Sequence, residues 1–550
     1  MSETFVAPTR RHINLVVLGL VVGMFLAALD QMVVATAIRT IGDDLQGLTL
    51  QAWVTTLYMI AATLTTPLYG KLSDLYGRKP LYLVALGLFV LGSLLCATAD
   101  SMAQLAAYRA VQGAGAGGLM ALAIMILGDL LPPRERTKYQ ASFFAVWGMA
   151  SVLGPVIGGF FAGADELLFL DGWRWIFMLN VPFGIGAWLL ITRVLHVPRL
   201  GKRSSRVDYW GVAALAAALG PLLVVLEQGQ DWGWGSPAVL LLGSVALIAT
   251  VVFLVIERKH GDDALLPLRL FRVKTVGIST GVNFIMGFAM FGGLAGLPLY
   301  LQISRGMTPT EAGLSMLPFT MGILVVAIIA TTVIRKTGHY KTFPVAGTTL
   351  LFVGSLLLSR LQYDDPFSAV FLGAAVFGAG LGGIMQPLML AVQNSLPARD
   401  NGVGTASVMF SRQIGGSIGT AVFLSLMFSQ VSDEIGVAIE ERAATPAFQE
   451  AVADPEVRAE ELNLVVIEAI QAGDISLAEE SGVSLDDTSF VRDLHPEIAA
   501  PFKIGFARAI TDVLLISSLI ILAALALIVF LPSLPLSEKS GLEHLSEDAD

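Results

Sequence analysis

Hydrophobic residues fill long uninterrupted blocks of this chain, and short polar segments separate the blocks. Fourteen blocks hold about 20 residues each, and a helix of that length spans the roughly 30 Å hydrocarbon core of a bilayer. They cover residues 13–38, 52–69, 81–99, 105–127, 141–162, 173–195, 209–226, 237–256, 275–301, 313–334, 343–361, 368–391, 404–428 and 509–531. The pattern predicts an all-α integral membrane protein with 14 transmembrane helices in a lipid bilayer.

Composition narrows the class further. Of the 550 residues, 55% are hydrophobic and 14% are charged, whereas about a quarter of the residues in a soluble protein are charged. Cys96 is the single cysteine, and the 6 histidines form no cluster with metal-ligand spacing, so we expect neither disulfides nor a metal site. The sequence has no phosphate-binding loop. We therefore expect no cofactor, no enzymatic activity and no nucleic-acid partner.

The basic residues predict the orientation of the chain. With the N-terminus inside, 23 of the 34 Lys and Arg residues fall in cytoplasmic segments, and the short external loops hold little more than Arg39, Arg174 and Arg305. The positive-inside rule then places both termini in the cytoplasm, which requires an even number of spans. We expect the protein in the cytoplasmic (inner) membrane.

The acidic excess lies mainly in one external segment. Residues 429–502 contain 17 Asp and Glu but only three basic residues, Arg442, Arg458 and Arg492. One interpretation is a solvated appendage with short amphipathic helices near residues 435–439 and 457–470. The other is an external lid that concentrates cations.

Part of the first half of the sequence recurs 265 residues later. The octapeptide GAGAGGLM at residues 113–120 matches GAGLGGIM at residues 378–385, and the same offset carries Gly154 onto Gly419. The fourth block therefore matches the twelfth, and the fifth matches the thirteenth. We predict two parallel six-helix halves, residues 1–200 and 263–550, with two inserted helices in residues 201–262. Such halves, with a substrate site between them, are a transporter architecture.

The loop after the second block, residues 70–80, combines glycines with charges of both signs. The positive-inside rule explains its bases, but not its acid or its glycines. A glycine permits a tight turn and close helix approach, and the acid can pair with an arginine of a neighbouring helix. We interpret Gly70, Asp74, Gly77, Arg78 and Lys79 as a cytoplasmic latch that holds one conformation closed. The corresponding loop of the second half, residues 335–341, has no acid.

Three charged residues lie deep within apolar blocks: Asp30, Arg109 and Arg412. An ionised side chain in the membrane costs about 2.5–3.5 kcal/mol on insertion scales, so such residues are retained with a partner or a function. Asp30 and Arg109 lie at similar depths and can pair. We expect either a structural ion pair or a proton-coupling pair, in which Asp30 takes a proton from outside and releases it inside. Arg412 either stabilises the second half or binds an anionic group.

The fifth block is rich in glycine. Gly148, Gly154, Gly158 and Gly159 permit close packing against a partner helix, and Pro155 removes a backbone hydrogen bond and bends the helix. This segment is therefore either a hinge or seal between the halves, or a simple packing surface.

Together these motifs resemble the major facilitator superfamily, and in particular its 14-helix family of drug:proton antiporters. The loop of residues 70–80 resembles the cytoplasmic signature of the superfamily. Arg109, Gln112 and the glycines after them resemble the proton-coupling motif, and the glycines and proline of the fifth block match the antiporter motif. Residues 29–38 and 173–182 resemble the signatures of the first and sixth helices, although Arg39 stands where the family usually has proline. The resemblance implies the major facilitator fold and favours export over uptake.

The sequence thus predicts a monomeric, proton-coupled antiporter that exports small amphipathic, drug-like substrates from the cytoplasm. Its 18 Met and 29 Phe residues provide adaptable apolar surface for such compounds. Candidates for the substrate cavity are Asn283, Phe284, Phe288, Phe291, Tyr300, Gln386, Gln393 and Arg412. Two alternatives stay open: an exporter of one endogenous metabolite or lipid, and a membrane scaffold or sensor that does not transport.

Overall fold

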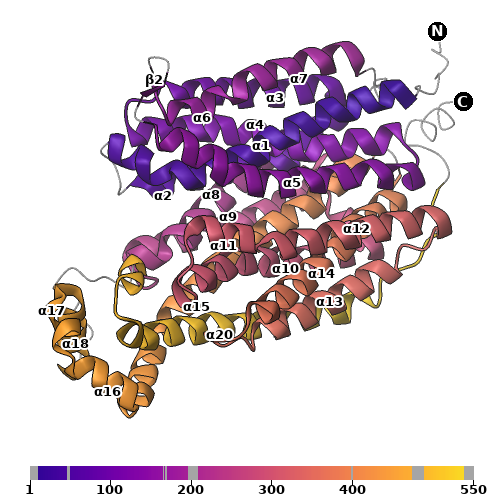
Figure 1. Ribbon diagram of the computed structural model, residues 1–550. Helices are drawn as coiled ribbons and strands as arrows, with labels where there is room; N and C mark the ends of the chain where they lie inside the picture. The colour runs from indigo at the N-terminus through magenta and orange to yellow at the C-terminus, as the bar shows by residue number, and fades with distance from the viewer. Residues whose placement is uncertain are drawn as a thin grey trace, which may run out of the picture.

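The computed structural model describes residues 10–45, 50–164, 166–167, 170–195, 208–397, 400–472 and 488–537. Two short strands, β1 (Glu166–Leu167) and β2 (Leu170–Asp171), pair antiparallel, and all other regular elements in these ranges are helical. The prediction of an all-helical protein is therefore confirmed apart from this hairpin. In Figure 1 the helices form two stacked groups, and the start of α1 lies at the same end as the last described residues. We call this end the terminal face and the opposite end the distal face.

The first half contains six predicted apolar blocks. Its helices are α1 (Arg10–Asp44), α2 (Gln51–Tyr76), α3 (Arg78–Ala97), α4 (Met102–Leu130), α5 (Pro133–Ala162), and the pair α6 (Arg174–Met178) and α7 (Asn180–Val194). The sixth block is split because Pro182 lacks a backbone N–H and its ring clashes with the carbonyl four residues earlier, at Met178. The break places Asn180 at the first position of α7.

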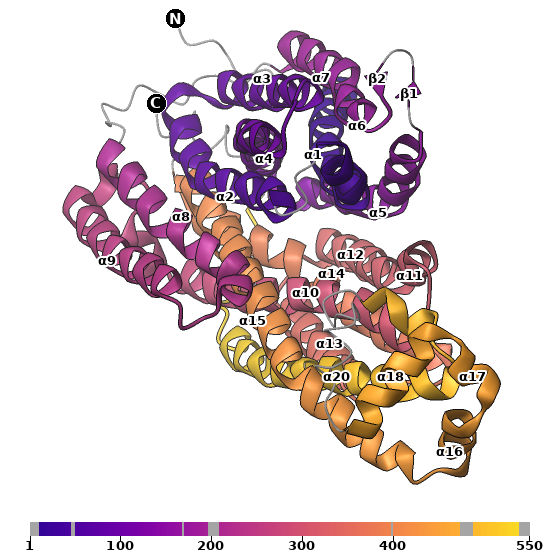
Figure 2. The same ribbon diagram turned by 90° about the vertical axis from the view of Figure 1, so that its left-hand side faces the viewer.

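The two inserted helices are α8 (Tyr209–Trp232) and α9 (Pro237–His260), which two 3-10 turns follow, η2 (Gly261–Asp263) and η3 (Leu268–Arg272). Helix α8 packs against α2 of the first half and α15 (Asn401–Ala443) of the second, so it covers one side of the seam between the halves. Figure 2 shows α9 outermost on this side. Leu241 and Leu247 of α9 are 66% and 68% exposed, as expected of a helix that faces lipid.

The second half follows the same plan. Its helices are α10 (Lys274–Leu299), which continues into the π-helical turn η4 (Tyr300–Ser304), α11 (Pro309–Ser315), α12 (Leu317–Thr337), α13 (Thr342–Leu358), α14 (Phe367–Ser395), α15 and α20 (Pro496–Ile528). Between α15 and α20 lie α16 (Pro446–Ala453), α17 (Pro455–Ala459), α18 (Glu461–Ala472) and the 3-10 turn η6 (Thr488–Arg492).

Helix contacts reproduce the internal repeat of the sequence. Helix α4 packs against both α2 and α3, and α14 packs in the same way against α12 and α13. Gly113 of α4 lies against the backbone carbonyl of Tyr58 in α2, and Gly378 of α14 lies against that of Phe319 in α12. A Cβ atom at either glycine would collide with the carbonyl oxygen. The repeated glycines therefore set the same close helix approach in both halves.

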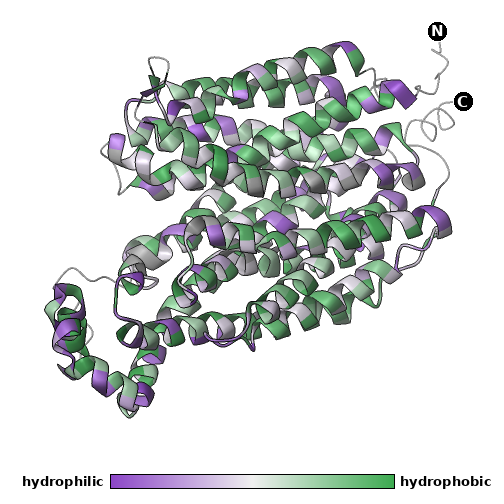
Figure 3. Cartoon of the chain, viewed as in Figure 1, coloured by the Kyte–Doolittle hydropathy of each residue, from purple (hydrophilic) through white to green (hydrophobic). Residues whose placement is uncertain are grey.

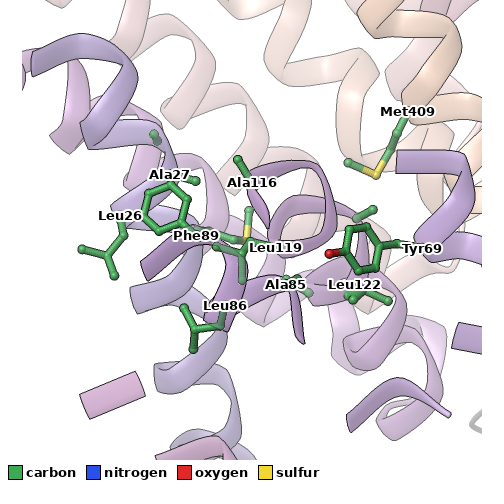
Figure 4. Close-up of a cluster of buried hydrophobic side chains, with 14 of the residues drawn as sticks. Leu26, Ala27, Tyr69, Ala85, Leu86, Phe89, Ala116, Leu119, Leu122 and Met409 are labelled. Carbon is green, nitrogen blue, oxygen red and sulfur yellow. The ribbon is translucent and has the colours of Figure 1, made fainter. Parts of the chain in front are cut away.

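Each half has its own apolar core. In the first half, α1, α2, α3 and α4 contribute Leu26, Tyr69, Phe89 and Leu122 among others (Figure 4). The second half has a separate core built mainly from α10, α13, α14, α15 and α20. Met409 of α15 belongs to the core of the first half and lies near Tyr69 in Figure 4, so the two halves are in contact there.

The surface of the bundle fits a bilayer. Eleven segments of the described chain are helical, long and apolar enough to cross a membrane, and every one of the 14 predicted blocks coincides with a described helix or a consecutive pair of helices. Polar residues gather towards the two ends of the bundle in Figure 3. The number of 14 spans itself stays a prediction.

The acidic segment differs from its prediction in one respect. Helix α15 does not end near residue 428 but continues to Ala443, because Ile435 packs closely against Gly505 of α20. The prediction of a separate short helix at residues 435–439 is therefore wrong. Beyond α15 the segment does form short helices, and its residues Phe448, Ile467 and Phe490 are buried in the core of the second half.

Candidate functional site

The structure brings Asp30 of α1 and Arg109 of α4 together inside the first half. The Arg109 guanidinium forms an ion pair with Oδ2 of Asp30, and the side chains are 1% and 0% exposed. The guanidinium also stacks on the Tyr58 ring of α2, 4.0 Å from its centroid. A buried charge needs such compensation, because removing one partner of a buried pair costs about 3–5 kcal/mol.

Neutral donors complete the surroundings of Asp30. Its Oδ1 accepts hydrogen bonds from Nε2 of Gln112 (2.8 Å) and Nδ2 of Asn180 (2.9 Å). The same two amide groups donate to Oγ of Ser93, at 2.8 and 3.3 Å. Gln112 also accepts a hydrogen bond from Arg109 at 2.6 Å. The Asp30 carboxylate on α1 therefore contacts side chains of α4 and α7, and Ser93 of α3 joins its two amide donors.

Glycines allow this convergence of helices. A Cβ atom on Gly92 of α3 would lie 2.5 Å from the backbone N of Gln112, so α3 approaches α4 at the residue before Ser93. Gly113 does the same between α4 and α2. Pro182, which causes the break between α6 and α7, places Asn180 at the start of α7, and from there the Asn180 amide reaches Asp30. Sequence reasoning identified Asp30 and Arg109 as a pair but assigned no role to Asn180 or Ser93.

The latch residues gather around Arg78 at the terminal face. Its guanidinium contacts Asp74 Oδ1 at 2.6 Å and Asp129 Oδ2 at 2.7 Å, and it donates to Ser73 Oγ. Gly77 makes the turn between α2 and α3 with a φ of 95°, a conformation that favours glycine. Asp129, at the end of α4, was missed. An acid near the end of an otherwise apolar helix was its signal in the sequence.

The latch lies against the other half of the protein. A Cβ atom on Gly70 of α2 would lie 2.6 Å from Cβ of Ala406 in α15, and one on Gly402 would touch both Asp74 and Arg78. Lys79 instead donates to the backbone carbonyl of Thr192 in α7, at 2.6 Å. The small residues thus let the end of α2 rest directly on the start of α15.

A second contact joins the halves at the same face. Arg136 of α5 donates to Oε1 of Gln393 in α14 at 2.9 Å, and Gln393 donates to Oγ1 of Thr405 in α15 at 3.3 Å. All three side chains are buried. The structure therefore shows a conformation that is closed at the terminal face.

The glycines of the fifth block pack α5 onto two helices. Gly154 lies against Met32 and Gly158 against Val33, both on α1. A Cβ atom on Gly148 would lie 2.9 Å from Cγ2 of Thr320 in α12. Gly159 has open space around it. Pro155 lies in α5, and its side chain is outside the described part of the chain. Helix α5 thus links the segment next to Asp30 to the second half.

Most of the predicted cavity residues are engaged within the second half. Asn283 donates to the carbonyl of Ser279 (2.9 Å) and Tyr300 to that of Gln362 (2.6 Å). The α10 positions Phe284, Phe288 and Phe291 lie against the α15 glycines Gly415, Gly419 and Gly416. Gln386 and Arg412 are different, because both are only partly buried and neither forms a hydrogen bond or ion pair with another described side chain.

Comparisons with known proteins agree with this architecture. The sequence profile of the Major Facilitator Superfamily matches residues 20–420. The chain is 36% identical over 437 residues to the uncharacterized MFS-type transporter MT1926 of Mycobacterium tuberculosis, covering 79% of this chain and 62% of that protein. It is 34% identical over 418 residues to the multidrug transporter protein MdtP of Bacillus subtilis, covering 75% of each. Among solved structures, the proton:xylose symporter XylE superposes with a TM-score of 0.57 at 15% identity, over 98% of this chain and 99% of that one, which reflects a shared fold.

Proposed function

The chain belongs to the Major Facilitator Superfamily, and from this we propose that it is a proton-coupled antiporter that exports amphipathic, drug-like compounds from the cytoplasm. The terminal face is then cytoplasmic and the distal face external, as the distribution of basic residues predicts. The protein works as a monomer in the cytoplasmic (inner) membrane. The name of MdtP, a multidrug transporter, supports this substrate class.

The buried pair of Asp30 and Arg109 is the observation that carries the proposal. Arginine stays protonated under all physiological conditions, so Asp30 is the member of the pair that can change charge. In the closed conformation Asp30 pairs with Arg109 and accepts hydrogen bonds from Gln112 and Asn180. A proton that arrives from the external side neutralises the carboxylate and removes the ion pair. Helix α1 is then free to shift against α4.

Helix α5 carries such a shift to the other half. It packs on α1 at Met32, two residues from Asp30, and on α12 at Thr320. Movement of α1 therefore alters the contact between the halves. Opening of the cytoplasmic side then separates Gly70 from Ala406 and Arg136 from Gln393. Release of the proton inside restores the pair and the closed latch.

The energy available is sufficient for export. A proton-motive force of about 150 mV supplies about 3.5 kcal/mol per charge, which supports a concentration ratio of a few hundred with one proton per cycle.

Transport by purified protein in proteoliposomes with an imposed pH gradient tests the proposal. We expect gradient-driven flux of an amphipathic dye that a protonophore abolishes, and a loss of at least about tenfold in Asp30→Asn. Asp493→Asn, at an exposed position outside the bundle, serves as the matched control and should behave as wild type. Flux that ignores the gradient in the wild type would show that antiport is wrong, and full coupling in Asp30→Asn would exclude Asp30 as the proton carrier.

A further inference from the structure

Arg412 stands apart from the other deep charges. Asp30 and Arg109 compensate each other, whereas Arg412 forms no ion pair or hydrogen bond with any side chain that the structure describes. It lies 11 residues into α15, about 16 Å along the helix, where a charge without a partner is unfavourable. Arginine cannot give up its proton to relieve this cost. An anion from outside the described chain is therefore the natural counter-charge.

The antiparallel arrangement of α14 and α15 places Arg412 at the same depth as Gln386. These helices run antiparallel, and Gln393 and Thr405 join them by a hydrogen bond near the cytoplasmic face. Seven residues further into the membrane on each helix, about 10 Å and two turns away, the same helix faces carry Gln386 and Arg412. The two side chains therefore lie at the same depth on facing sides of α14 and α15.

The side chains at the level of Gln386 and Arg412 are more exposed than those at the level of Gln393 and Thr405. Gln393 and Thr405 are 4% and 0% exposed, because Arg136 of the other half closes over them. Gln386 and Arg412 are less completely buried. The neighbouring residue Gln413 accepts a hydrogen bond from Thr66 of α2 at 3.4 Å, so this part of α15 lies at the seam between the halves. Arg412 thus lies beside the seam, above the cytoplasmic closure, in a less tightly packed level than Gln393 and Thr405.

We infer that Arg412, assisted by Gln386, binds the carboxylate of an amphipathic substrate. The planar guanidinium matches a carboxylate with two parallel hydrogen bonds, and the Gln386 amide offers a further donor. The apolar body of the substrate would lie along the half-buried neighbours Met385 and Phe291. The inference rests on the proposed export function and narrows its substrates to compounds that carry a carboxylate on an apolar skeleton.

Binding of two matched dyes to the purified full-length protein tests this inference. Rhodamine B carries a carboxylate, and its ethyl ester has the same aromatic skeleton without that charge. Fluorescence anisotropy gives the Kd of each dye for the wild type, Arg412→Gln, Arg412→Lys and Gln386→Leu. Arg360→Gln, which removes an exposed arginine near the external end of α13, is the matched control.

We expect the wild type and Arg360→Gln to bind the carboxylate dye about 10- to 100-fold more tightly than the ester, as hydrogen bonds to charged groups imply. Arg412→Gln should abolish the difference without weakening the ester, Arg412→Lys should keep part of it, and Gln386→Leu should reduce it. Equal affinities in the wild type, no saturable binding of rhodamine B, or a preference that persists in Arg412→Gln would overturn the inference. If Arg412→Gln does not fold, Gln386→Leu and Arg412→Lys still decide it, since an unchanged preference in both would contradict it.

Transport of the ester separates this inference from the proposed function. Proton-driven flux of the ester in both wild type and Arg412→Gln, combined with equal dye affinities in the wild type, would refute only the role of Arg412. Absence of proton-driven flux in the wild type would instead refute the antiport.

Discussion

A single methyl group at the contact between α2 and α15 should shift the protein towards the conformation that is open to the cytoplasm. The substitution is Gly70→Ala. The added Cβ would lie 2.6 Å from Cβ of Ala406, whereas ordinary contacts between such atoms are about 3.5–4.0 Å. The two helices must therefore separate by about 1 Å to accept it. The collision exists only while the cytoplasmic side is closed.

The size of the shift follows from the cost of overpacking, which is typically about 1–3 kcal/mol. Because each 1.4 kcal/mol changes an equilibrium tenfold, the open conformation should gain about 5- to 100-fold relative to the closed one. Alanine favours a helix by up to about 1 kcal/mol over glycine, but this term acts on both conformations and cancels between them.

Alkylation of a buried cysteine measures the population. Thr405→Cys, in a background with Cys96→Ala, places a thiol at a position that is 0% exposed in the closed conformation. We expect a membrane-permeant maleimide to label it about 5- to 100-fold faster when Gly70→Ala is added. Gly87→Ala is the control, since no atom lies within 4 Å of a Cβ at that position of α3. Equal labelling rates in the two variants would refute the argument that Gly70 sets the cytoplasmic closure.

Three further predictions concern the latch, the surroundings of Asp30 and the glycines of α5. Because Arg78 has two carboxylate partners, Asp74→Asn and Asp129→Asn should each slow turnover more than they weaken substrate binding, and the double variant should be slower than either; unchanged turnover in the double variant would remove the latch hypothesis. Asn180→Ala deletes one hydrogen bond to the Asp30 carboxylate, worth about 1.5–3 kcal/mol for a charged acceptor, so proton-driven flux should fall about 10- to 100-fold while dye affinity stays within about twofold; unaltered flux would show that the amide does not support Asp30. Gly158→Leu should abolish transport by forcing α5 away from Val33, whereas Gly159→Ala should be neutral because its Cβ meets nothing; equal activities of these two variants would contradict a role of α5 packing.

The helices were predictable because apolar blocks of membrane length leave little choice of structure. The pairing of Asp30 with Arg109 was predictable for a related reason: few charges lie in these blocks, and two of them lie at one depth. Asn180 and Ser93 were not predictable, since neutral polar residues are common in membrane helices. Their convergence on Asp30 also depends on the break before α7.

Contacts between the halves were the least predictable part of the site. Gln393 was expected near the substrate, but it binds Arg136 and Thr405 where the terminal face is closed. The residue pattern along one helix indicates which face of that helix is polar. It does not indicate which residue of the other half contacts that face in a given conformation. The continuation of α15 past residue 428 was missed for a similar reason, because its distal part is held by Ile435 against α20.

The length of α15 connects events on both sides of the membrane. Its 43 residues span about 64 Å, twice the thickness of the hydrocarbon core. One helix thus carries Ala406 at the closed terminal face, Arg412 about a quarter of the way along, and the acidic helices at its far end. Any tilt of α15 that opens the terminal face must move this end, so α16 to α18 change position at the distal face whenever the terminal face opens. An antibody fragment that fixes helices α16 to α18 against the rest of the second half should stop the transport cycle without entering the membrane.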